Sequence, residues 1–421
     1  MGKAIFAYSV AVCVCLQSVV GTPRQDSLPR SDRNLDARKL LAVGAGETAH
    51  TSTTVGLKLY CSIPSGQNVV LSPVSITAGL SMLYLGAKGT TAQELERTVG
   101  FPGQPLDESL HMSIGQLSSP HSSKDFTFKS ANNLFVNPQQ PIVSYYSSIA
   151  QQAYDVTPTV MDFSSNPEGN RIEINQWVAS QTGGKITDLL PAGSISEATQ
   201  LVLVNAVFFS AKWATEFPKT RTRMQEFTKS DGQEIQVNMM SREGTFNYGM
   251  DKSLKAQVLE LPYRERQYSM FLVLPVRDKS LQEIEQQFCS MGVSVAQYIA
   301  DRKNKMSREL LDVQLPRFNL QEELSLHDLL PQLGVTTLFK QNLADLSGID
   351  GTRNLYVAQA QHKALIQVDE SGTRAAAATA SGVVLRSRTP EFVANRPFMF
   401  IIFDNINKAV LFLGRVNDPI A

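Results

Sequence analysis

The strongest constraint on the fold is the run TQLVLVNAVFF at residues 199–209, which is apolar almost throughout. Val, Leu and Phe follow one another without the alternation of polar residues that marks a half-exposed strand. Residues that are β-branched or aromatic favour strands, and a continuous apolar run is typical of a strand covered on both faces. The run therefore predicts a strand buried on both sides.

Other segments predict both helices and strands. Residues 71–89 begin a helix with Ser72 as the N-cap and Pro73 in the first turn, followed by apolar residues at helical spacing as far as Gly86. Residues 170–186 predict a second helix that ends at a glycine pair. Strands are predicted within 230–240 (a hairpin turn at Asp231-Gly232), 269–275, 310–318 and, as a pair, 397–416. Helices early and strands late, without regular βαβ alternation, indicate an α+β fold.

The N-terminal end has the composition of a secretory signal. Residues 1–21 contain an early lysine, an apolar run and small residues at their end. A membrane anchor is the alternative, but the apolar run is short for a span and no basic residue follows it directly. Residues 22–46 are polar and charged, which predicts a mobile extension. Residues 47–421 show no break in composition, so we expect one domain there.

Charge and cysteine content narrow the class of protein. The 39 basic and 39 acidic side chains balance, which gives no basic surface for nucleic acid or an anionic membrane. Cys13 and Cys15 would leave with the signal, so the mature chain keeps Cys61 and Cys289. A chain this long with two cysteines is not a disulfide scaffold. The sequence does not decide whether the pair is bridged, and we expect two buried free thiols.

No catalytic motif accompanies this composition. The chain lacks a His-Glu-x-x-His helix, a Cys-x-x-Cys pair outside the signal, a Gly-x-Ser-x-Gly elbow and a phosphate-binding glycine loop. The histidines are isolated from one another: His50, His111, His121, His327 and His362. An enzyme is therefore the weaker alternative.

A stretch near the C-terminal end has an unusual composition. Residues 375–382 are nearly all Ala, Thr, Ser and Gly. Such small side chains need little desolvation or ordering, so the stretch can change from an exposed loop to a buried strand at low cost. Gly372 allows a bend where the stretch begins, and Arg386 follows it. This pattern predicts a loop that can become a strand and that displays a basic side chain.

The chain resembles the serpins in segments that follow the family's order. The resemblance rests on NVVLSPVSITAGLSMLYLGAKGTTAQEL (68–95), LVLVNAVFFSAKWATEF (201–217), LELPY (259–263), LDVQLPRFNL (311–320), DESGTRAAAATA (369–380), NRPFMFII (395–402) and VLFLGRVNDP (410–419). It implies three β-sheets, about eight or nine helices and an exposed reactive loop at about 371–395. Residues 161–178 and 357–373 are similar to the branch of plasminogen activator inhibitors and protease nexin.

The resemblance also implies a reactive bond. In serpins the bait residue is the seventeenth position counted from the hinge glutamate, and from Glu370 this position is Arg386. Cleavage is then expected between Arg386 and Ser387. An arginine suits a trypsin-like protease, whose specificity pocket ends in a carboxylate. The implied function is that of a secreted suicide substrate, which traps the acyl-enzyme by loop insertion. For Arg388 we favour a solubilising surface role over a second bait.

The remaining site residues are also carried over from the family. The hinge would comprise Glu370, Gly372, Thr373, Arg374, Ala375, Ala376, Ala377, Ala378 and Thr379. The shutter, where the central sheet opens, would comprise Ser72, Ser75, Asn205 and His362. The breach, where insertion begins, would comprise Trp213 and Arg317, with Arg317 paired to Glu370. Without the family match, a structural hydrogen bond explains Asn205 equally well, and Ser72 can be both a helix cap and a shutter residue. For the others we would then favour a structural histidine at His362, a core tryptophan at Trp213 and two solvated charges at Glu370 and Arg317.

Two departures from the family bear on function. Arg374 stands where many inhibitory hinges have an acidic residue, but strand alternation would point its side chain away from the core side. Residues 92–101 contain Arg97 as their one basic residue, so heparin activation by that route is not expected. We expect a monomer whose partner is a trypsin-like serine protease, without cofactor, metal, nucleic acid or membrane. A non-inhibitory serpin, such as a carrier or chaperone, is the alternative.

Overall fold

The computed structural model describes residues 48–101, 105, 107–118, 122–137, 140–291, 294–372 and 389–420. The expected signal peptide and N-terminal extension lie outside the described residues. So do the expected hinge and reactive-site residues Thr373, Arg374, Ala375, Ala376, Ala377, Ala378, Thr379, Arg386, Ser387 and Arg388.

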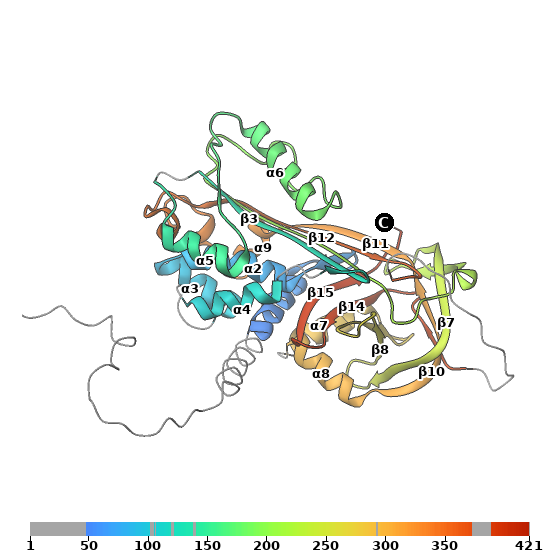
Figure 1. Ribbon diagram of the computed structural model, residues 1–421. Coiled ribbons are helices and arrows are strands. Elements are labelled where there is room, and N and C mark those ends of the chain that lie inside the picture. Colours follow the sequence, from blue (N-terminus) through green and yellow to red (C-terminus); the bar gives the residue numbers. More distant parts are fainter. Residues whose placement is uncertain are drawn as a thin grey trace, which may run out of the picture. The chain divides into compact units, whose positions relative to one another are not determined.

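Helices occur mainly in the first half of the described chain, as the α+β prediction requires (Figure 1). After a helix through residues 48–62, they are α2 (Pro73–Gly86), α3 (Gly89–Leu95), α4 (Glu108–Ser118), α5 (Ser144–Tyr154), α6 (Pro167–Thr182), α7 (Leu281–Ser290), α8 (Val295–Lys305), α9 (Leu326–Gln332) and α10 (Ser347–Asp350). A π-helical turn spans Glu96–Gly100, and 3-10 turns span Lys219–Arg221 and Thr337–Phe339. Within the described ranges, no helix combines the length and apolar composition that crossing a membrane requires.

The strands form two hydrogen-bonded sheets. One has the order β11-β12-β5-β3-β2, with β4 beside β3, and the other has the order β1-β15-β14-β9-β8-β7-β10-β13, with β6 beside β7. Their bounds are β1 Val69–Leu71, β2 Ser122–Ser123, β3 Phe126–Val136, β4 Thr159–Val160, β5 Leu201–Ala211, β6 Arg223–Thr228, β7 Glu234–Asp251, β8 Ala256–Pro262, β9 Tyr268–Pro275, β10 Ser307–Pro316, β11 Phe318–Ser325, β12 Val357–Val368, β13 Glu391–Val393, β14 Phe398–Asp404 and β15 Ala409–Val416.

The length of β7 explains why three expected sheets appear as two hydrogen-bonded units. Its first half pairs with β6 and its second half with β8, while β10 pairs along its middle. The smaller expected sheet and the larger one beside it therefore share a continuous strand. The α+β architecture predicted from the sequence is confirmed.

The predicted strand at 199–209 is β5, and it is buried on both faces as expected. Its side chains alternate between two apolar clusters: Val202, Val204 and Phe208 face the cluster beneath α6, while Val207 and Phe209 face the second sheet. Helix α6 covers the outer face of the six-stranded sheet (Figure 1). The continuous apolar run is thus explained by two covering layers rather than one.

Local signals for helix boundaries are also confirmed. The side chain of Ser72 accepts a hydrogen bond from the backbone of Ser75, and Pro73 occupies the first turn of α2. At the other predicted helix, Gly183 adopts a left-handed conformation (φ 63°) and ends α6. The predicted turn at Asp231-Gly232 joins β6 to β7. All of α2 is buried, so this helix lies in the core rather than on the surface.

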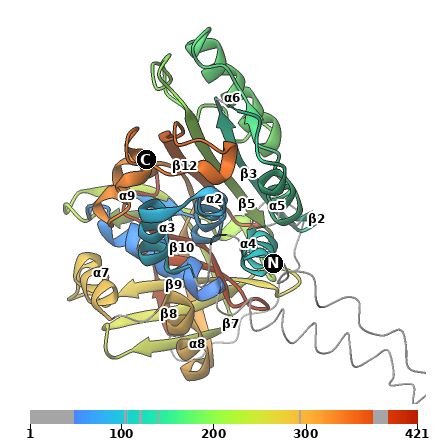
Figure 2. The ribbon, with the colours of Figure 1, turned by 90° about the vertical axis from the view of Figure 1, so that its left-hand side faces the viewer.

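The expectation of two free thiols is wrong. Cys61, in the helix through residues 48–62, is bonded to Cys289 near the end of α7, with a Cα–Cα distance of 6.1 Å. This distance lies within the range that a disulfide spans. Helices α7 and α8 lie beside strands of the nine-stranded sheet, as Figure 2 shows. The two cysteines are 228 residues apart, so no local pattern could reveal that they meet.

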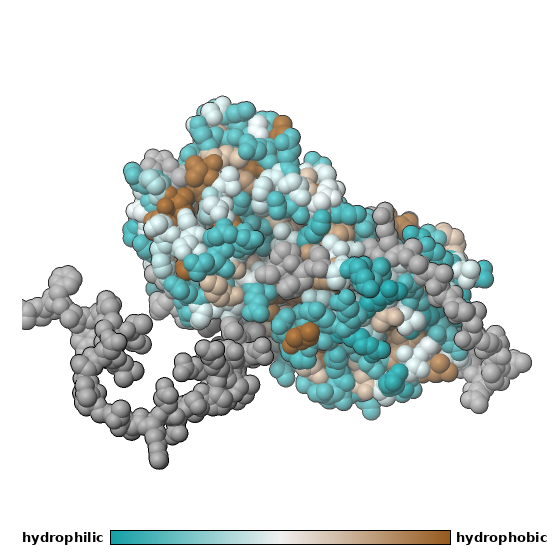
Figure 3. All heavy atoms as spheres, in the orientation of Figure 1, coloured by the Kyte–Doolittle hydropathy of each residue, from teal (hydrophilic) through white to brown (hydrophobic). Residues whose placement is uncertain are grey.

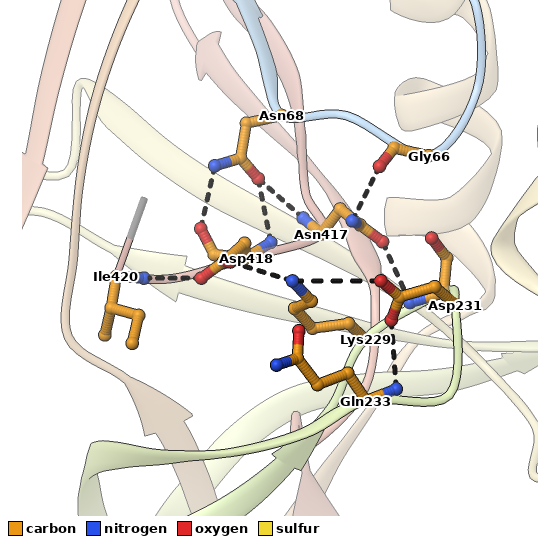
Figure 4. Close-up of polar contacts among 9 residues, drawn as sticks. Gly66, Asn68, Lys229, Asp231, Gln233, Asn417, Asp418 and Ile420 are labelled. Carbon is orange, nitrogen blue, oxygen red and sulfur yellow. Dashed lines mark hydrogen bonds and ion pairs between the residues drawn. The ribbon is translucent and has the colours of Figure 1, made fainter.

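Residues after β15 tie the C-terminal end to the β6–β7 hairpin (Figure 4). The backbone N–H groups of Asn417 and Asp418 donate to the side-chain oxygen of Asn68, at 2.8 and 2.9 Å. Lys229 of the hairpin pairs with Asp418 at 3.3 Å and with Asp231 at 3.9 Å. The hairpin is thereby fixed to the end of β15.

The disulfide generates a prediction about stability. The double variant Cys61→Ser/Cys289→Ser is expected to lose about 2–4 kcal/mol in the free energy of unfolding, because it frees a long loop in the unfolded chain. Denaturant unfolding of the variant and the wild type would measure this difference. A titration of thiols in the denatured, unreduced wild type is the control. In a chain without residues 1–21, which removes Cys13 and Cys15, two free thiols per chain would contradict the bridge.

Candidate functional site

The predicted shutter residues lie on one row across the central sheet. In strand register, Asn132 of β3 is opposite Asn205 of β5, and Asn205 is opposite His362 of β12. Strands β5 and β12 run parallel, from the pair Leu201/Val357 to the pair Phe209/Ile366. We call this parallel ladder the β5–β12 seam. The seam is crossed near its middle by polar side chains that are surrounded by apolar ones.

The start of α2 lies against this row and completes a hydrogen-bond network. Asn205 donates to the backbone oxygen of Ser75 at 2.7 Å and also to the side-chain oxygen of Asn132. The backbone N–H of Ser72 donates to His362 Nε2 at 3.2 Å, while His362 Nδ1 is bonded to Asn205 Oδ1. The four predicted shutter residues, Ser72, Ser75, Asn205 and His362, are therefore in one connected cluster. All four are fully buried.

The protonation state of His362 follows from these partners. Its Nε2 faces an N–H group and must accept, so the ring proton is on Nδ1 and is donated to Asn205. A second proton on Nε2 would place two donors against each other. Complete burial lowers the pKa of His362 to about 3 from its ordinary value of 6.5. The network therefore requires a neutral histidine.

The predicted breach residue Trp213 binds the backbone at the end of β12. Its indole Nε1 donates to the oxygen of Asp369 at 2.9 Å, and its backbone N–H donates to the oxygen of Ser371 at 3.0 Å. The ring stacks on Tyr263 with 4.6 Å between centroids. Phe217 adds a third contact, since its backbone N–H donates to the oxygen of Glu370 at 2.8 Å. Residues 213–217 therefore bind residues 369–371, directly after β12, through three hydrogen bonds.

Position 372 requires a glycine because backbone atoms pack closely around it, and not only because the chain bends there. Gly372 has a φ of 90°, which side-chain-bearing residues rarely adopt. A Cβ atom there would overlap the backbone of Ala211, Lys212 and Trp213. The segment leaving β12 is thus pressed against the end of β5, at the point where the seam would have to open.

The expected pair of Glu370 and Arg317 is present at this end of the sheet. Arg317 Nε lies 3.6 Å from Glu370 Oε2, and Thr222 donates to the other carboxylate oxygen at 2.7 Å. Glu370 is buried, but the side chain of Arg317 is 49% exposed. Water screens such a pair, so the ion pair itself contributes at most about 1 kcal/mol. The hydrogen bond from Thr222 gives the carboxylate a second partner.

Sequence reasoning missed residues that complete both clusters. Ser130 and Asn132 contact Ser75 from β3. Thr222 and Asp369 contact Glu370 and Trp213. Asn132 could have been noticed as an amide within a strand that is otherwise apolar at its end. In the described part of the chain, no group of three or more His, Cys, Asp or Glu side chains could hold a metal ion.

The buried histidine generates a prediction about pH. Because the folded-state pKa of His362 is depressed to about 3, its stabilising contribution is complete above about pH 6.5 and declines as the pH falls toward 3. The slope approaches about 1.4 kcal/mol per pH unit between these values. Unfolding midpoints of the wild type and His362→Gln would be compared from pH 7.5 to 4.5. Parallel curves below pH 6.5 would show that His362 is not the group responsible.

Comparisons with known proteins agree with this geometry. The family model described as serpin (serine protease inhibitor) matches residues 50–419. Leukocyte elastase inhibitor of Bos taurus is 37% identical over 367 residues, covering 85% of this chain and 94% of that protein. Among solved structures, native protease nexin-1 with heparin is similar with a TM-score of 0.79 and 28% identity, covering 89% of this chain and all of that one. Uncleaved ovalbumin has a TM-score of 0.79 and 29% identity, covering 88% and 99%.

The family match covers nearly the whole described chain, and the relatives are covered over most of their own length. The residues predicted for the shutter and for the breach lie at the middle and at one end of the β5–β12 seam. The chain therefore belongs to the serpin family of serine protease inhibitors, and it is not an enzyme.

Proposed function

We propose that the chain is a secreted suicide-substrate inhibitor of trypsin-like serine proteases, cleaved between Arg386 and Ser387. The observation that carries this proposal is the position of Gly372. Gly372 lies at the end of the β5–β12 seam, and in the sequence the stretch of small residues, 375–382, begins three positions after it. A protease that attacks Arg386 would form an acyl-enzyme on its carbonyl carbon. Entry of residues 373–386 into the sheet would then carry the protease away from the loop's starting position.

The direction of the strands supports this insertion. Strands β5 and β12 are parallel to each other. A segment that turns back from the end of β12 and enters between them runs antiparallel to both. Antiparallel ladders have well-aligned hydrogen bonds, and the new strand would replace one ladder with two. Alternate residues of the stretch, from Thr373 to Thr379, are small enough to face a packed core.

The charge of Arg386 supports the choice of protease. A guanidinium makes a paired, charge-assisted contact with a carboxylate, which is the group at the base of a trypsin-like specificity pocket. The bait position rests on the family's spacing from Glu370. Arg388 lies two residues further and serves as the natural control for this spacing.

Secretion is supported by two features outside the expected reactive loop. The Cys61–Cys289 disulfide is typical of an oxidising compartment. Residues 1–21 have the composition of a signal peptide. We therefore propose that the domain acts outside the cell.

We further propose a place in the branch of plasminogen activator inhibitors and protease nexin. The segments 161–178 and 357–373 and the likeness to protease nexin-1 support it. We expect no heparin activation through residues 92–101, where Glu94 is occupied by the backbone N–H groups of Thr336 and Thr337. A monomeric state is supported by the face in Figure 3, on which apolar residues occur in small separate groups.

A bait substitution tests the specificity. Arg386→Ala is expected to lower the rate constant for inhibition of trypsin by a factor on the order of 10³, because the pocket carboxylate loses its ionic partner. Arg388→Ala is the matched control and should inhibit as well as the wild type. Inhibition kinetics and mass spectrometry of the cleaved loop would be measured together. The reverse pattern, with loss only in Arg388→Ala, would place the reactive bond two residues later.

Loop cleavage tests the mechanism without a physiological target. After one cut at Arg386, residues 373–386 should insert and add on the order of 10 kcal/mol through ladder hydrogen bonds and packing. The unfolding temperature of the cleaved protein should then exceed that of the intact protein by roughly tens of degrees. Calorimetry of both forms in one buffer gives the comparison. Equal unfolding temperatures would favour a non-inhibitory serpin, such as a carrier. Arg374 in the predicted hinge would then be one reason why the loop does not insert.

A further inference from the structure

A cavity lies beside the predicted breach; residues 213–215 and 217 line it, and none of its described lining residues belongs to β12. Its volume is about 390 Å³, within the range of small-molecule sites. Trp213 and Phe217 form one wall, and β7, β8 and β10 contribute the others through Arg242, Glu260 and Arg308. The breach and this cavity therefore share a wall.

Arg242 is the most unusual residue of the cavity. Its guanidinium lies over the ring of Phe246 at 4.4 Å and near that of Phe217 at 5.9 Å. Nη1 donates to the backbone oxygen of Thr215 at 2.5 Å, but Nε is buried without a partner. Burial lowers the pKa of Arg242 to about 10, so the group is still cationic at neutral pH. Arg242 is half-buried, and its one buried donor, Nε, is costly to leave without a partner unless a ligand supplies an acceptor.

The other charges of the cavity do not balance this cation. Arg266 and Arg308 also line it and are exposed, so the cavity is open to solvent on their side. Among its described lining residues the only acid is Glu260, which is already engaged by Lys303 at 3.1 Å and Ser269 at 2.8 Å. Within the described part of the chain, the three arginines have no carboxylate within 4 Å. The cavity is thus aromatic on one wall and cationic on the others.

We propose that this cavity binds a small organic anion, bearing a phosphate, sulfate or carboxylate group, between the guanidinium groups of Arg242, Arg266 and Arg308. Planar guanidinium groups bind the oxygens of such anions in pairs. The rings of Trp213 and Phe217 offer an apolar surface to the rest of the ligand. The site is separate from the reactive loop and from the shutter.

The shared wall couples the ligand to the breach. Arg242 holds Thr215, and the same segment binds the hinge through the backbone N–H groups of Trp213 and Phe217. An anion that fixes Arg242 would restrain residues 213–217 in the closed arrangement. Because a ligand stabilises the state it binds, insertion would slow and a larger share of the inhibitor would be cleaved as a substrate. This consequence rests on the proposed inhibitory function, whereas the binding itself does not.

Calorimetric titration of the intact protein at low ionic strength tests the binding. Pyrophosphate, citrate and glucose 6-sulfate are separate probes for the three kinds of anion. At least one should bind with a dissociation constant below about 1 mM. Arg308→Gln should weaken its binding about tenfold or more, the value of one charge-assisted contact. Arg353→Gln is the control, because Arg353 is an exposed arginine that pairs with Asp345 instead.

Because Arg308 is exposed, its substitution should leave the fold intact, and thermal unfolding would verify this. Arg242→Gln should weaken binding further if it folds. Absence of binding by all three probes would overturn the site. Equal binding by the wild type and Arg308→Gln would also overturn it, since the anion would then be bound elsewhere.

A partition experiment tests the coupling. The protein is mixed with trypsin, with and without the bound probe, and the covalent complex and the cleaved inhibitor are quantified by denaturing electrophoresis. The probe should lower the ratio of complex to cleaved product about threefold or more, and Arg308→Gln should abolish this change. An unchanged ratio at saturation would overturn the coupling. Failure to form any complex without the probe would instead contradict the proposed function, while calorimetry would still decide the site.

Discussion

The parallel ladder between β5 and β12 is the interaction on which the proposed mechanism depends. Each of its hydrogen bonds contributes a net of about 0.5–1.5 kcal/mol, and an inserted antiparallel strand would exchange one ladder for two. The closed sheet is therefore not the arrangement with the most hydrogen bonds. In the proposed mechanism the uncut loop is attached at both ends, since it follows β12 and precedes β13, which pairs with β10 in the other sheet. This double attachment would keep the additional strand outside until the loop is cut.

The polar row at the middle of the seam suits a sheet that has to open. An apolar core resists separation through close packing, and it offers no alternative partners to an entering strand. Asn205 and His362 instead join the strands through side-chain hydrogen bonds. The start of α2 supplies partners for both, since the backbone oxygen of Ser75 accepts from Asn205 and the backbone N–H of Ser72 donates to His362. Such groups can exchange one hydrogen-bond partner for another when the strands separate, provided that every donor and acceptor of the network keeps a partner. The price is a buried imidazole that must remain neutral.

Much of the architecture follows from local sequence signals, because caps, turns and apolar runs act over short distances. Ser72 with Pro73 fixes the start of α2, and residues 199–209 form the doubly covered strand. The disulfide was predicted wrongly because its cysteines come from distant helices. Asn132 and Thr222 were missed for the same reason, because the sheet brings their partners to them from distant parts of the sequence. The roles of hinge, breach and shutter came from the family resemblance.

The predicted shutter, at the middle of the seam, and the predicted breach, at its end, differ in chemistry. Different solution conditions should therefore act on each of them. The shutter consists of buried, neutral hydrogen bonds, so salt has little access to it, whereas protonation of His362 removes an acceptor. The predicted breach contains the ion pair of Glu370 with a half-exposed Arg317, and Arg242 donates to the backbone oxygen of Thr215 in the segment 213–217. Salt weakens the interactions of solvent-exposed charges, with a screening length of about 8–10 Å at physiological ionic strength. In the proposed mechanism, salt and anions would therefore act at the entrance of the seam, and pH at its middle.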